Sequence, residues 1–380
     1  MPWKESTRMS RRFEFIAFAR APGANMSELC RRFEISRQTG YKWLRRAEFV
    51  ALDVQDRSRR PASSPRRTAP GVEAHVVAIR QRYPFYGGRK IRRILGREGL
   101  ESPPAASTIT SILARNGLLS PQRRRVRNWQ RFEEAAPNAL WQMDFKGHFP
   151  LSKGRCHPLT VLDDHSRFCI CLAACADEEG STARSHLTAA LRHYGLPERM
   201  LMDNGPPWGS SGQSLHTAFT AWLIRLGVSV SHGRPHHPQT QGKDERFHRT
   251  LKLEVIGQRS VWHDNPEVQI AFDGYRPLYN FERPHEALAF EVPGSRYAPS
   301  PRPFPDVLPA IEYDSEFDVR RVQQNGRVKL KSRRFFVGKA FAEEPVGLRQ
   351  VGDAVWDAYY CHQRIARIDL AQPPSGNEEV

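Results

Sequence analysis

Residues 141–145 read Trp-Gln-Met-Asp-Phe, an apolar run that carries one carboxylate, Asp144. A second apolar run ends in Met-Asp-Asn-Gly at residues 202–205, which adds Asp203. Both runs have the composition of strands, and ligands that follow strands gather at the carboxyl edge of a sheet. Acidic side chains that a fold brings together repel each other, so we expect these two to share a cation.

A third carboxylate, Glu245, lies in residues 241–252, which read Gln-Gly-Lys-Asp-Glu-Arg-Phe-His-Arg-Thr-Leu-Lys and predict a helix. Three oxygen ligands with no cysteine nearby suit the hard cations Mg²⁺ or Mn²⁺ better than Zn²⁺. The combination indicates phosphoryl-transfer chemistry on nucleic acid. A single Asp at a strand end is usually a turn residue, and we interpret Asp163 and Asp164 in that way.

The positive charge of the chain is confined to its first third. Residues 1–135 hold 29 Lys and Arg against 12 Asp and Glu, a surplus of 17, whereas residues 136–380 hold 29 against 29. A codon bias toward arginine is the alternative, because only 10 of the 58 basic residues are lysine, but such a bias would not cancel in the second part. Binding to a phosphate backbone requires this charge, so we expect double-stranded DNA as the partner.

Neither hydropathy nor cysteine usage indicates export. No apolar stretch of the sequence approaches the length of a membrane span, and residues 1–18 mix charges into any candidate signal core. The six cysteines form no Cys-x-x-Cys pair, which favours buried reduced thiols over disulfides or a zinc site. We expect a cytoplasmic, nucleoid-associated protein with no membrane partner and no small-molecule substrate.

Two helical units are predicted in the basic region. In the first, helices at residues 27–33 and 36–46 are separated by a break, and Ser36 caps the second helix. Its inward-facing residues are expected to be Leu29, Phe33, Ile35, Tyr41 and Leu44. The second helix also carries candidate major-groove contacts, which are Arg37, Gln38, Lys42 and Arg45. An ordinary helical hairpin with a basic solvent face is the alternative.

The second unit has helix patterns at residues 72–83, 88–98 and 107–116. Arg89 and Lys90 stand at the start of the middle helix, where backbone N–H groups also favour phosphate. These two residues are therefore candidate DNA contacts as well.

From about residue 138 the pattern changes to strands. Three strand patterns followed by alternating helices and strands predict a mixed α/β sheet covered on both faces. The strands are expected at 140–149, 159–163, 168–174, 199–203 and 228–231, and the helices at 181–194, 214–226 and 240–256. After a Pro-rich stretch, a small β-barrel is predicted from strands at 317–322, 327–330, 334–337, 346–351 and 354–359.

Several motifs in order resemble the integrase core of bacterial insertion-sequence transposases, which is related to the retroviral integrase catalytic domain. They are Trp-Gln-Met-Asp-Phe at 141–145, Asp-Asn-Gly at 203–205, His-Pro-Gln-Thr-Gln-Gly at 237–242, Glu-Arg-Phe-His-Arg-Thr-Leu-Lys at 245–252 and the Tyr-Asn and Arg-Pro-His pair within 279–285. The resemblance runs through roughly residues 137–300. The N-terminal helical units and the Asp-Arg-Ser-Arg-Arg-Pro linker at 56–61 are similar to one subgroup of these transposases.

The resemblance implies a ribonuclease H-like fold with an Asp-Asp-Glu triad that binds two Mg²⁺ (or Mn²⁺) ions. Asp144 falls on the first family Asp, Asp203 on the second, and Glu245 on the Glu that precedes the basic helix. The 41 residues between Asp203 and Glu245 exceed the usual spacing, which we interpret as an insertion at residues 206–213. Asp244 is the alternative to Glu245 as the third carboxylate.

The implied activity is that of a transposase, which binds the ends of a mobile DNA element, cleaves the donor strand and joins its 3′-hydroxyl to target DNA as a homo-oligomer. Further candidate DNA contacts beside the triad are Lys243, Arg246 and Arg249. A loop against DNA, and not a zinc site, is expected for His232, His236 and His237. A catalytically inactive DNA-binding protein or repressor, and a nuclease without strand transfer, are the alternatives.

These patterns predict eight segments along the chain. They are a helix-turn-helix DNA-binding domain (1–55), a basic linker (56–71), a second helix-turn-helix domain (72–122), a basic tether (123–137), the ribonuclease H-like core (138–292), a Pro-rich linker (293–310), the small β-barrel (311–371) and a disordered tail (372–380).

Overall fold

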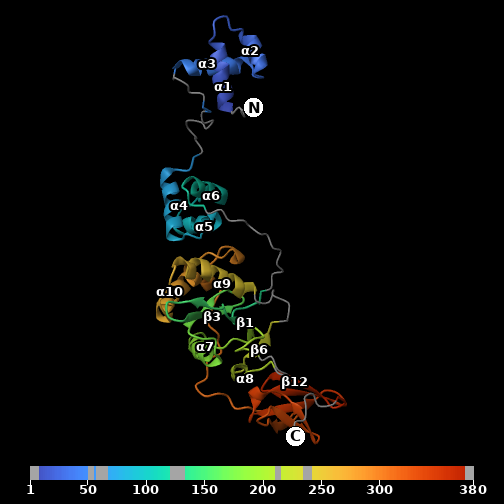
Figure 1. Cartoon of the computed structure of the whole chain (residues 1–380). Helices are drawn as coiled ribbons and strands as arrows, with labels where there is room; N and C mark the ends of the chain where they lie inside the picture. Colours follow the sequence, from blue (N-terminus) through green and yellow to red (C-terminus); the bar gives the residue numbers. More distant parts are fainter. Residues whose placement is uncertain are drawn as a thin grey trace. The chain divides into compact units, whose positions relative to one another are not determined.

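The computed structural model describes residues 8–49, 55–56, 67–119, 133–209, 215–233 and 242–372. The chain forms two compact units, Met1–Thr68 and Ala69–Val380 (Figure 1). Most of the predicted linker and tether, the tail beyond residue 372, and the histidine motif at 237–241 lie outside the described residues. Within the described ranges, no helix has both the length and the apolarity that a bilayer span requires.

The first unit is a bundle of three helices, α1 (Arg8–Ala19), α2 (Met26–Arg32) and α3 (Arg37–Phe49). Its buried core consists of Phe15, Ile16, Cys30, Trp43 and Ala47. The sequence prediction missed α1 and placed Tyr41 in the core, but the Tyr41 side chain is 42% exposed. Trp43 fills that role instead, because its position on α3 faces the apolar side of α1.

A close approach of helices explains Gly40 in this unit. A Cβ atom at Gly40 would lie 2.8 Å from the Cys30 sulfur and 2.9 Å from the Phe15 ring. Any larger side chain would therefore separate α3 from α1 and α2. The predicted cap is confirmed, since the Ser36 hydroxyl accepts a hydrogen bond from the Thr39 N–H at 3.2 Å.

The second unit begins with three more helices, α4 (Pro70–Arg82), α5 (Gly88–Arg97) and α6 (Ala106–Arg115), close to the predicted ranges. Apolar residues from all three helices form one buried core, which includes Val76, Ile91, Leu95, Ile109 and Leu113. The prediction of an all-helical N-terminal region is therefore confirmed.

A mixed sheet follows, as predicted. Its strands are β1 (Leu140–Phe145), β2 (Phe149–Pro150), β3 (Arg155–Asp163), β4 (Cys169–Cys175), β5 (Arg199–Met202) and β6 (Ser229–His232). The order is β4-β3-β1-β5-β6, and β2 pairs with the start of β3. The first three long strands are antiparallel, whereas β1, β5 and β6 run parallel to one another.

Helices cover both faces of this sheet (Figure 1). On one face, the side chains of Trp141 and Met143 share a buried cluster with α7 (Gly180–Tyr194) and α8 (Ala218–Arg225). On the other face, Leu162 and Leu172 pack in a second cluster with α9 (Gly242–Glu254) and α10 (Asn265–Pro277). The strands are apolar on both faces because each face is buried under helices, which confirms the predicted architecture.

The outer edge of the sheet is covered by polar side chains of and after α10. The Gln269 side chain accepts from the Ala174 N–H at 2.8 Å and donates to the Leu172 carbonyl at 3.2 Å. The Asn280 side chain accepts from the Cys169 N–H at 2.8 Å and donates to the Cys169 carbonyl at 3.0 Å. These amides replace a neighbouring strand, so the edge strand β4 presents few free groups to another chain.

The C-terminal segment is an open sheet. Its strands are β7 (Asp318–Arg321), β8 (Arg327–Leu330), β9 (Arg333–Phe336), β10 (Pro345–Gln350), β11 (Val355–Tyr360) and β12 (Gln363–Asp369). Four of them form an antiparallel sheet in the order β12-β11-β10-β7, and β8 and β9 form a separate hairpin. The predicted barrel is not confirmed. The prediction also missed β12, which pairs with β11 and carries three charged residues among its seven.

All six cysteines are free thiols, and five of them are buried, as predicted. Burial raises the pKa of Cys171 and Cys175 to about 12, so these thiols are protonated near neutral pH.

A buried ion pair fixes the C-terminal end of α9. The Arg283 guanidinium donates from Nε and Nη2 to the Glu254 carboxylate at 2.9 and 2.8 Å, and both side chains are only 10% exposed. The Tyr275 hydroxyl donates to the same carboxylate at 3.0 Å. All hydrogen-bonding atoms of the carboxylate are thus satisfied within the protein.

Arg283→Met should lower the free energy of unfolding by about 3–5 kcal/mol, because it leaves the Glu254 charge buried without a partner. Replacing both Arg283 and Glu254 by Met should recover most of that loss. Urea unfolding followed by the fluorescence of the core tryptophans measures both. As a control, Arg320→Met breaks the exposed pair with Asp318 and should cost less than about 1 kcal/mol. Equal losses for Arg283→Met and Arg320→Met would contradict the interpretation.

Candidate active site

Two of the three predicted carboxylates lie side by side at the carboxyl edge of the sheet. Asp144 is next to the last residue of β1, and Asp203 follows the last residue of β5. In the parallel pairing of these strands, Gln142 lies opposite Leu201, so the register continued by two residues sets Asp144 opposite Asp203. Parallel pairing in this register thus brings the two carboxylates together.

The third carboxylate belongs to α9. Glu245 lies in the first turn of this helix and is exposed, while its neighbours Asp244 and Phe247 are buried. Asp244 is 1% exposed, and neither of its carboxylate oxygens receives a hydrogen bond in the described part of the chain. Burial and repulsion from Asp144 raise its pKa well above the ordinary value. The exposed position of Glu245 favours it over Asp244 as the third ligand.

The electrostatics of Asp144 indicate that the other two predicted carboxylates lie near it. Burial and then repulsion from Asp203 raise the pKa of Asp144 from 3.8 to about 7, and Glu178 and Glu245 add to the rise. Four carboxylates therefore lie close enough to affect one another, and a divalent cation would relieve that repulsion. This excess of negative charge and the all-oxygen donor set fit Mg²⁺ or Mn²⁺.

The cluster is not a closed metal cage. Across the described residues, no three His, Cys, Asp or Glu side chains converge tightly enough to hold one ion. Asp203 and Glu245 remain exposed, as expected where the mutual repulsion of carboxylates is not offset. Asp144 and Asp203 thus share one edge of the sheet, and Glu245 lies close enough to Asp144 for the two charges to repel each other.

Hydrogen bonds fix the turn that carries Asp203. Its Oδ1 accepts from the Asn204 N–H at 2.7 Å, and the Asn204 side chain donates to the Gly233 carbonyl at 2.8 Å. The His232 ring bonds the Asp203 carbonyl through Nδ1 at 2.9 Å. This contact joins the ends of β5 and β6 and gives His232 a structural role. His236 and His237 lie outside the described residues.

Sequence reasoning missed His248, which lies three residues after Glu245 on α9. Its Nε2 is 2.8 Å from the Thr160 hydroxyl, which itself donates to the Asp144 carbonyl at 3.1 Å. Because that hydroxyl has a single proton, the His248 ring donates to it from Nε2, and the other ring nitrogen, Nδ1, lies 4.0 Å from Asp144 Oδ2. Burial and the Lys146 ammonium lower the pKa of His248 to about 3, so the ring is neutral.

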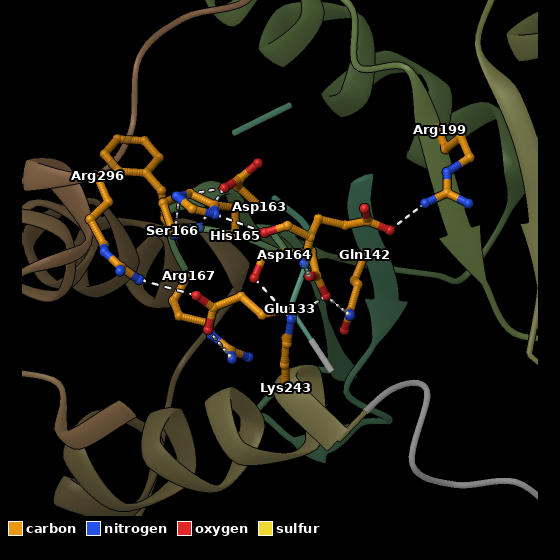
Figure 2. Close-up of polar contacts among 12 residues, drawn as sticks. Glu133, Gln142, Asp163, Asp164, His165, Ser166, Arg167, Arg199, Lys243 and Arg296 are labelled. Carbon is orange, nitrogen blue, oxygen red and sulfur yellow. Dashed lines mark hydrogen bonds and ion pairs between the residues drawn. The ribbon is translucent and has the colours of Figure 1, made fainter. Parts of the chain in front are cut away.

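The basic residues of α9 divide into two groups. Arg246 and Arg249 are exposed, as expected for contacts to a DNA backbone. Lys243 instead forms a buried ion pair with Asp164, and its side chain is only 11% exposed (Figure 2). The interpretation of Asp163 as a turn residue fits the structure, because its carboxylate accepts from the Ser166 N–H at 2.7 Å. Asp164 does more than the predicted turn residue, because its carboxylate also contacts Lys243 and Gln142.

The predicted DNA contacts of the two helical units lie on α3 and at the start of α5. In the first unit, four exposed residues lie on α3 at helical spacing, namely Arg37, Gln38, Lys42 and Arg45. In the second unit, Arg89 is exposed at the start of α5 and forms an ion pair with Glu286. Lys90 is half-buried, with its ammonium 4.6 Å from the centre of the Tyr86 ring.

Asp144→Asn should stabilise the metal-free protein relative to the wild type as pH rises from 3.8 to about 7. The folded state binds the Asp144 proton more tightly than the unfolded chain, so ionising this group costs stability across that window. The difference in unfolding free energy should grow by on the order of 1–3 kcal/mol. Adding Mg²⁺ at pH 7 should stabilise the wild type and leave Asp144→Asn nearly unchanged.

Urea unfolding at several pH values, with and without Mg²⁺, measures this prediction. Glu312→Gln removes an exposed carboxylate outside the cluster and should follow the wild type under every condition. A pH-independent difference between Asp144→Asn and the wild type would show that Asp144 does not titrate in this range.

Comparisons with known proteins agree with the order of these parts. Residues 134–238 and 226–293 match two integrase core domain families, and residues 317–374 match the C-terminal domain of IS481 family transposases. Residues 6–49 and 39–113 match homeodomain-like domain families. A chain from the human T-cell lymphotropic virus family, the HTLV-2 integrase catalytic core domain in complex with magnesium, aligns at 15% identity over 43% of this chain and 99% of that chain, with a TM-score of 0.33.

A simian T-cell lymphotropic virus intasome chain, determined in complex with PP2A regulatory subunit B56 gamma, aligns at 17% identity over 76% of this chain and 97% of that chain, with a TM-score of 0.37. Among sequences, the uncharacterized 31.7 kDa protein of insertion element IS407 from Burkholderia multivorans is 25% identical over 63% of this chain and 85% of its own length. The Gag-Pro-Pol polyprotein of squirrel monkey retrovirus is 35% identical over 30% of this chain but only 6% of its own length. The chain thus carries an integrase core domain followed by the C-terminal domain of IS481 family transposases, and it is similar to a protein of an insertion element.

Proposed function

We propose that this chain is a Mg²⁺- or Mn²⁺-dependent polynucleotidyl transferase that binds the ends of a mobile DNA element, cleaves the donor strand and joins it to target DNA. One observation carries the proposal. Asp144 on β1 lies opposite Asp203, which directly follows the parallel strand β5, and burial together with repulsion from Asp203 and Glu245 raises the pKa of Asp144. Such a cluster of mutually repelling carboxylates fits a pair of hard cations and a phosphate between them.

In this proposal Asp144, Asp203 and Glu245 would hold the ions. When bound, the two ions supply Lewis acidity at the scissile phosphate and make a water or hydroxyl oxygen nucleophilic. The protein contributes orientation, because β1, β5 and α9 fix the three carboxylates around one point. Arg246 and Arg249, exposed on α9 beside Glu245, hold the DNA backbone in register with that point.

Two successive transfers take place at this site. In the first, a water oxygen attacks the donor phosphorus and the bond to the 3′-oxygen breaks, which leaves a 3′-hydroxyl and a 5′-phosphate. In the second, that 3′-hydroxyl attacks a target phosphorus, a new bond to the 3′-oxygen forms, and the target strand loses its own 3′-hydroxyl as the leaving group. The first step is a hydrolysis, and the second replaces one phosphodiester bond by another. Neither step therefore requires an external energy source.

DNA binding is assigned to the basic N-terminal part. The exposed residues of α3 contact base edges in the element ends, and the start of α5 contacts phosphates. Joining two DNA ends requires two copies of the catalytic core, so we expect a homo-oligomer assembled on DNA.

A catalytically inactive end-binding protein and a nuclease without strand transfer are the competing functions. The clustered carboxylates argue against the first, because a protein that only binds DNA has no need to keep mutually repelling groups together. The helix-turn-helix units argue against the second, because a plain nuclease does not need to hold specific ends. Neither alternative produces a joined donor–target molecule.

The joining reaction tests the proposal. Purified protein is incubated with Mg²⁺, a labelled fragment of the DNA that flanks the coding region, and a supercoiled target plasmid. Wild type and the exposed-carboxylate control Glu312→Gln should join label to target, whereas Asp144→Asn, Asp203→Asn and Glu245→Gln should lose at least about 100-fold in rate, since each removes a cation ligand. Cleavage without joining would favour the nuclease, and DNA binding without chemistry in Mg²⁺ or Mn²⁺ would favour the inactive end-binder.

Two substitutions should separate base recognition from backbone binding. Gln38→Ala should lower the preference for element ends over random DNA by roughly 5- to 150-fold, because a bidentate base contact contributes about 1–3 kcal/mol. Arg249→Ala should weaken binding to both DNAs alike and reduce the slope of log affinity against log salt by about 0.9. Fluorescence anisotropy at several salt concentrations measures both effects. Identical behaviour of the two variants would overturn the assignment.

A further inference from the structure

We propose that Asp164 is a positioning residue that fixes Glu245 relative to Asp144 through a buried ion pair with Lys243. The inference rests on the proposed function, because Glu245 matters only if the carboxylate cluster is catalytic. The structural basis is a chain of direct contacts that links the strand of one carboxylate to the helix of another (Figure 2).

The first link joins the turn after β3 to α9. Asp164 is fully buried, and the Lys243 ammonium forms an ion pair with its carboxylate while donating to its backbone carbonyl at 2.9 Å. A single ammonium therefore contacts both the side chain and the main chain of one residue. That arrangement is directional, so it fixes the rotation of the first turn of α9.

The second link joins the same carboxylate to β1. Oδ1 of Asp164 accepts from the Gln142 side chain at 2.7 Å, and Oδ2 accepts from the Glu134 N–H at 2.8 Å. The Asp164 N–H donates to the Leu140 carbonyl at 2.9 Å. Asp164 is thus held from three sides, and two of its contacts come from residues of β1.

The two partners of Asp164 lie close in sequence to two of the proposed ligands. Gln142 lies two residues before Asp144 on β1, and Lys243 lies two residues before Glu245 on α9. Asp164 contacts both, so a shift of α9 along or around its axis would break a buried bond. Apolar contacts of Phe247 and Leu251 hold α9 against the sheet but specify its rotation less sharply, because hydrophobic contact is not directional.

Stability alone does not account for this pair. Taking a carboxylate and an ammonium out of water costs as much as their attraction returns, and apolar residues of similar volume hold a core together equally well. A buried ion pair that contributes little net stability but fixes one geometry is consistent with a positioning role. Arg167 and Glu133, which form a neighbouring ion pair, enclose the Lys243 side of the network (Figure 2).

The test compares two buried pairs on the same helix. One variant replaces Asp164 by Leu and Lys243 by Met, which removes both charges without leaving either one buried alone. The control replaces Glu254 and Arg283 by Met, which removes the ion pair at the other end of α9, nine residues beyond Glu245. The full chain is used, and the measurements are the melting temperature, the affinity for element-end DNA, the single-turnover joining rate and the Mn²⁺ affinity by electron paramagnetic resonance.

The Asp164 and Lys243 variant should fold and bind end DNA within twofold of wild type, but lose 10- to 100-fold in joining rate and in Mn²⁺ affinity, the usual effect of removing a partner that orients a metal ligand. The control pair should keep both within threefold. Lys243→Arg, which retains the charge, should recover part of the joining rate. Wild-type joining and Mn²⁺ affinity in the Asp164 and Lys243 variant would overturn the inference and leave the proposed function intact.

The same measurements also identify failure of the proposed function and a purely structural role of the ion pair. If wild type neither binds Mn²⁺ nor joins DNA, the proposed function fails, and the inference about Asp164 falls with it. If the variant melts far below wild type and loses DNA affinity in proportion to its joining rate, the pair is structural only, and the positioning role is overturned.

Discussion

The position of α9 on the sheet is the constraint on which the rest of the site depends. Phe247 and Leu251 bury its apolar face against β3 and β4, and buried ion pairs engage both ends of the helix. Apolar burial supplies attraction without direction, whereas an ion pair in a dry environment is satisfied at few geometries. The helix therefore has one orientation, and the exposed face that remains carries Glu245, Arg246 and Arg249.

The charges around this helix are separated by burial. Carboxylates gather at the sheet edge, where Asp144 is partly buried among Asp203, Glu178 and Glu245. Cationic side chains are either used internally, like Lys243 and Arg283, or left on the surface, like Arg246. A negative centre beside exposed positive charge suits a reaction in which the cations meet the phosphate and the arginines meet the flanking backbone. Burial and the Lys146 ammonium keep His248 neutral beside Asp144.

The structure also gives physical meaning to the Tyr-Asn and Arg-Pro-His motif at 279–285. Asn280 bonds both backbone groups of Cys169 and covers the free edge of the sheet. Arg283 forms the bidentate pair with Glu254 that ends α9. The segment after the core thus stabilises two of its elements at once, the edge strand β4 and the helix α9.

The sequence by itself determined the fold class and the approximate helix and strand ranges, and it predicted Asp144 and Asp203, which the register of β1 and β5 sets opposite each other. Periodicity and strand-end position report how each residue relates to its own element, and those signals are local. The barrel prediction is not confirmed, because strand patterns do not say whether a sheet closes. Tyr41 was misplaced because the side of α3 that is buried depends on α1, which the sequence reading did not include.

Only the tertiary structure decided which polar groups became partners. Lys243 has the same sequence signal as Arg246, a basic residue on a helix, yet it is buried with Asp164, 79 positions away. His248 and Thr160 are separated by 88 positions. A charged side chain leaves water only where the fold supplies a countercharge, and that supply depends on contacts between distant segments, which no local pattern records.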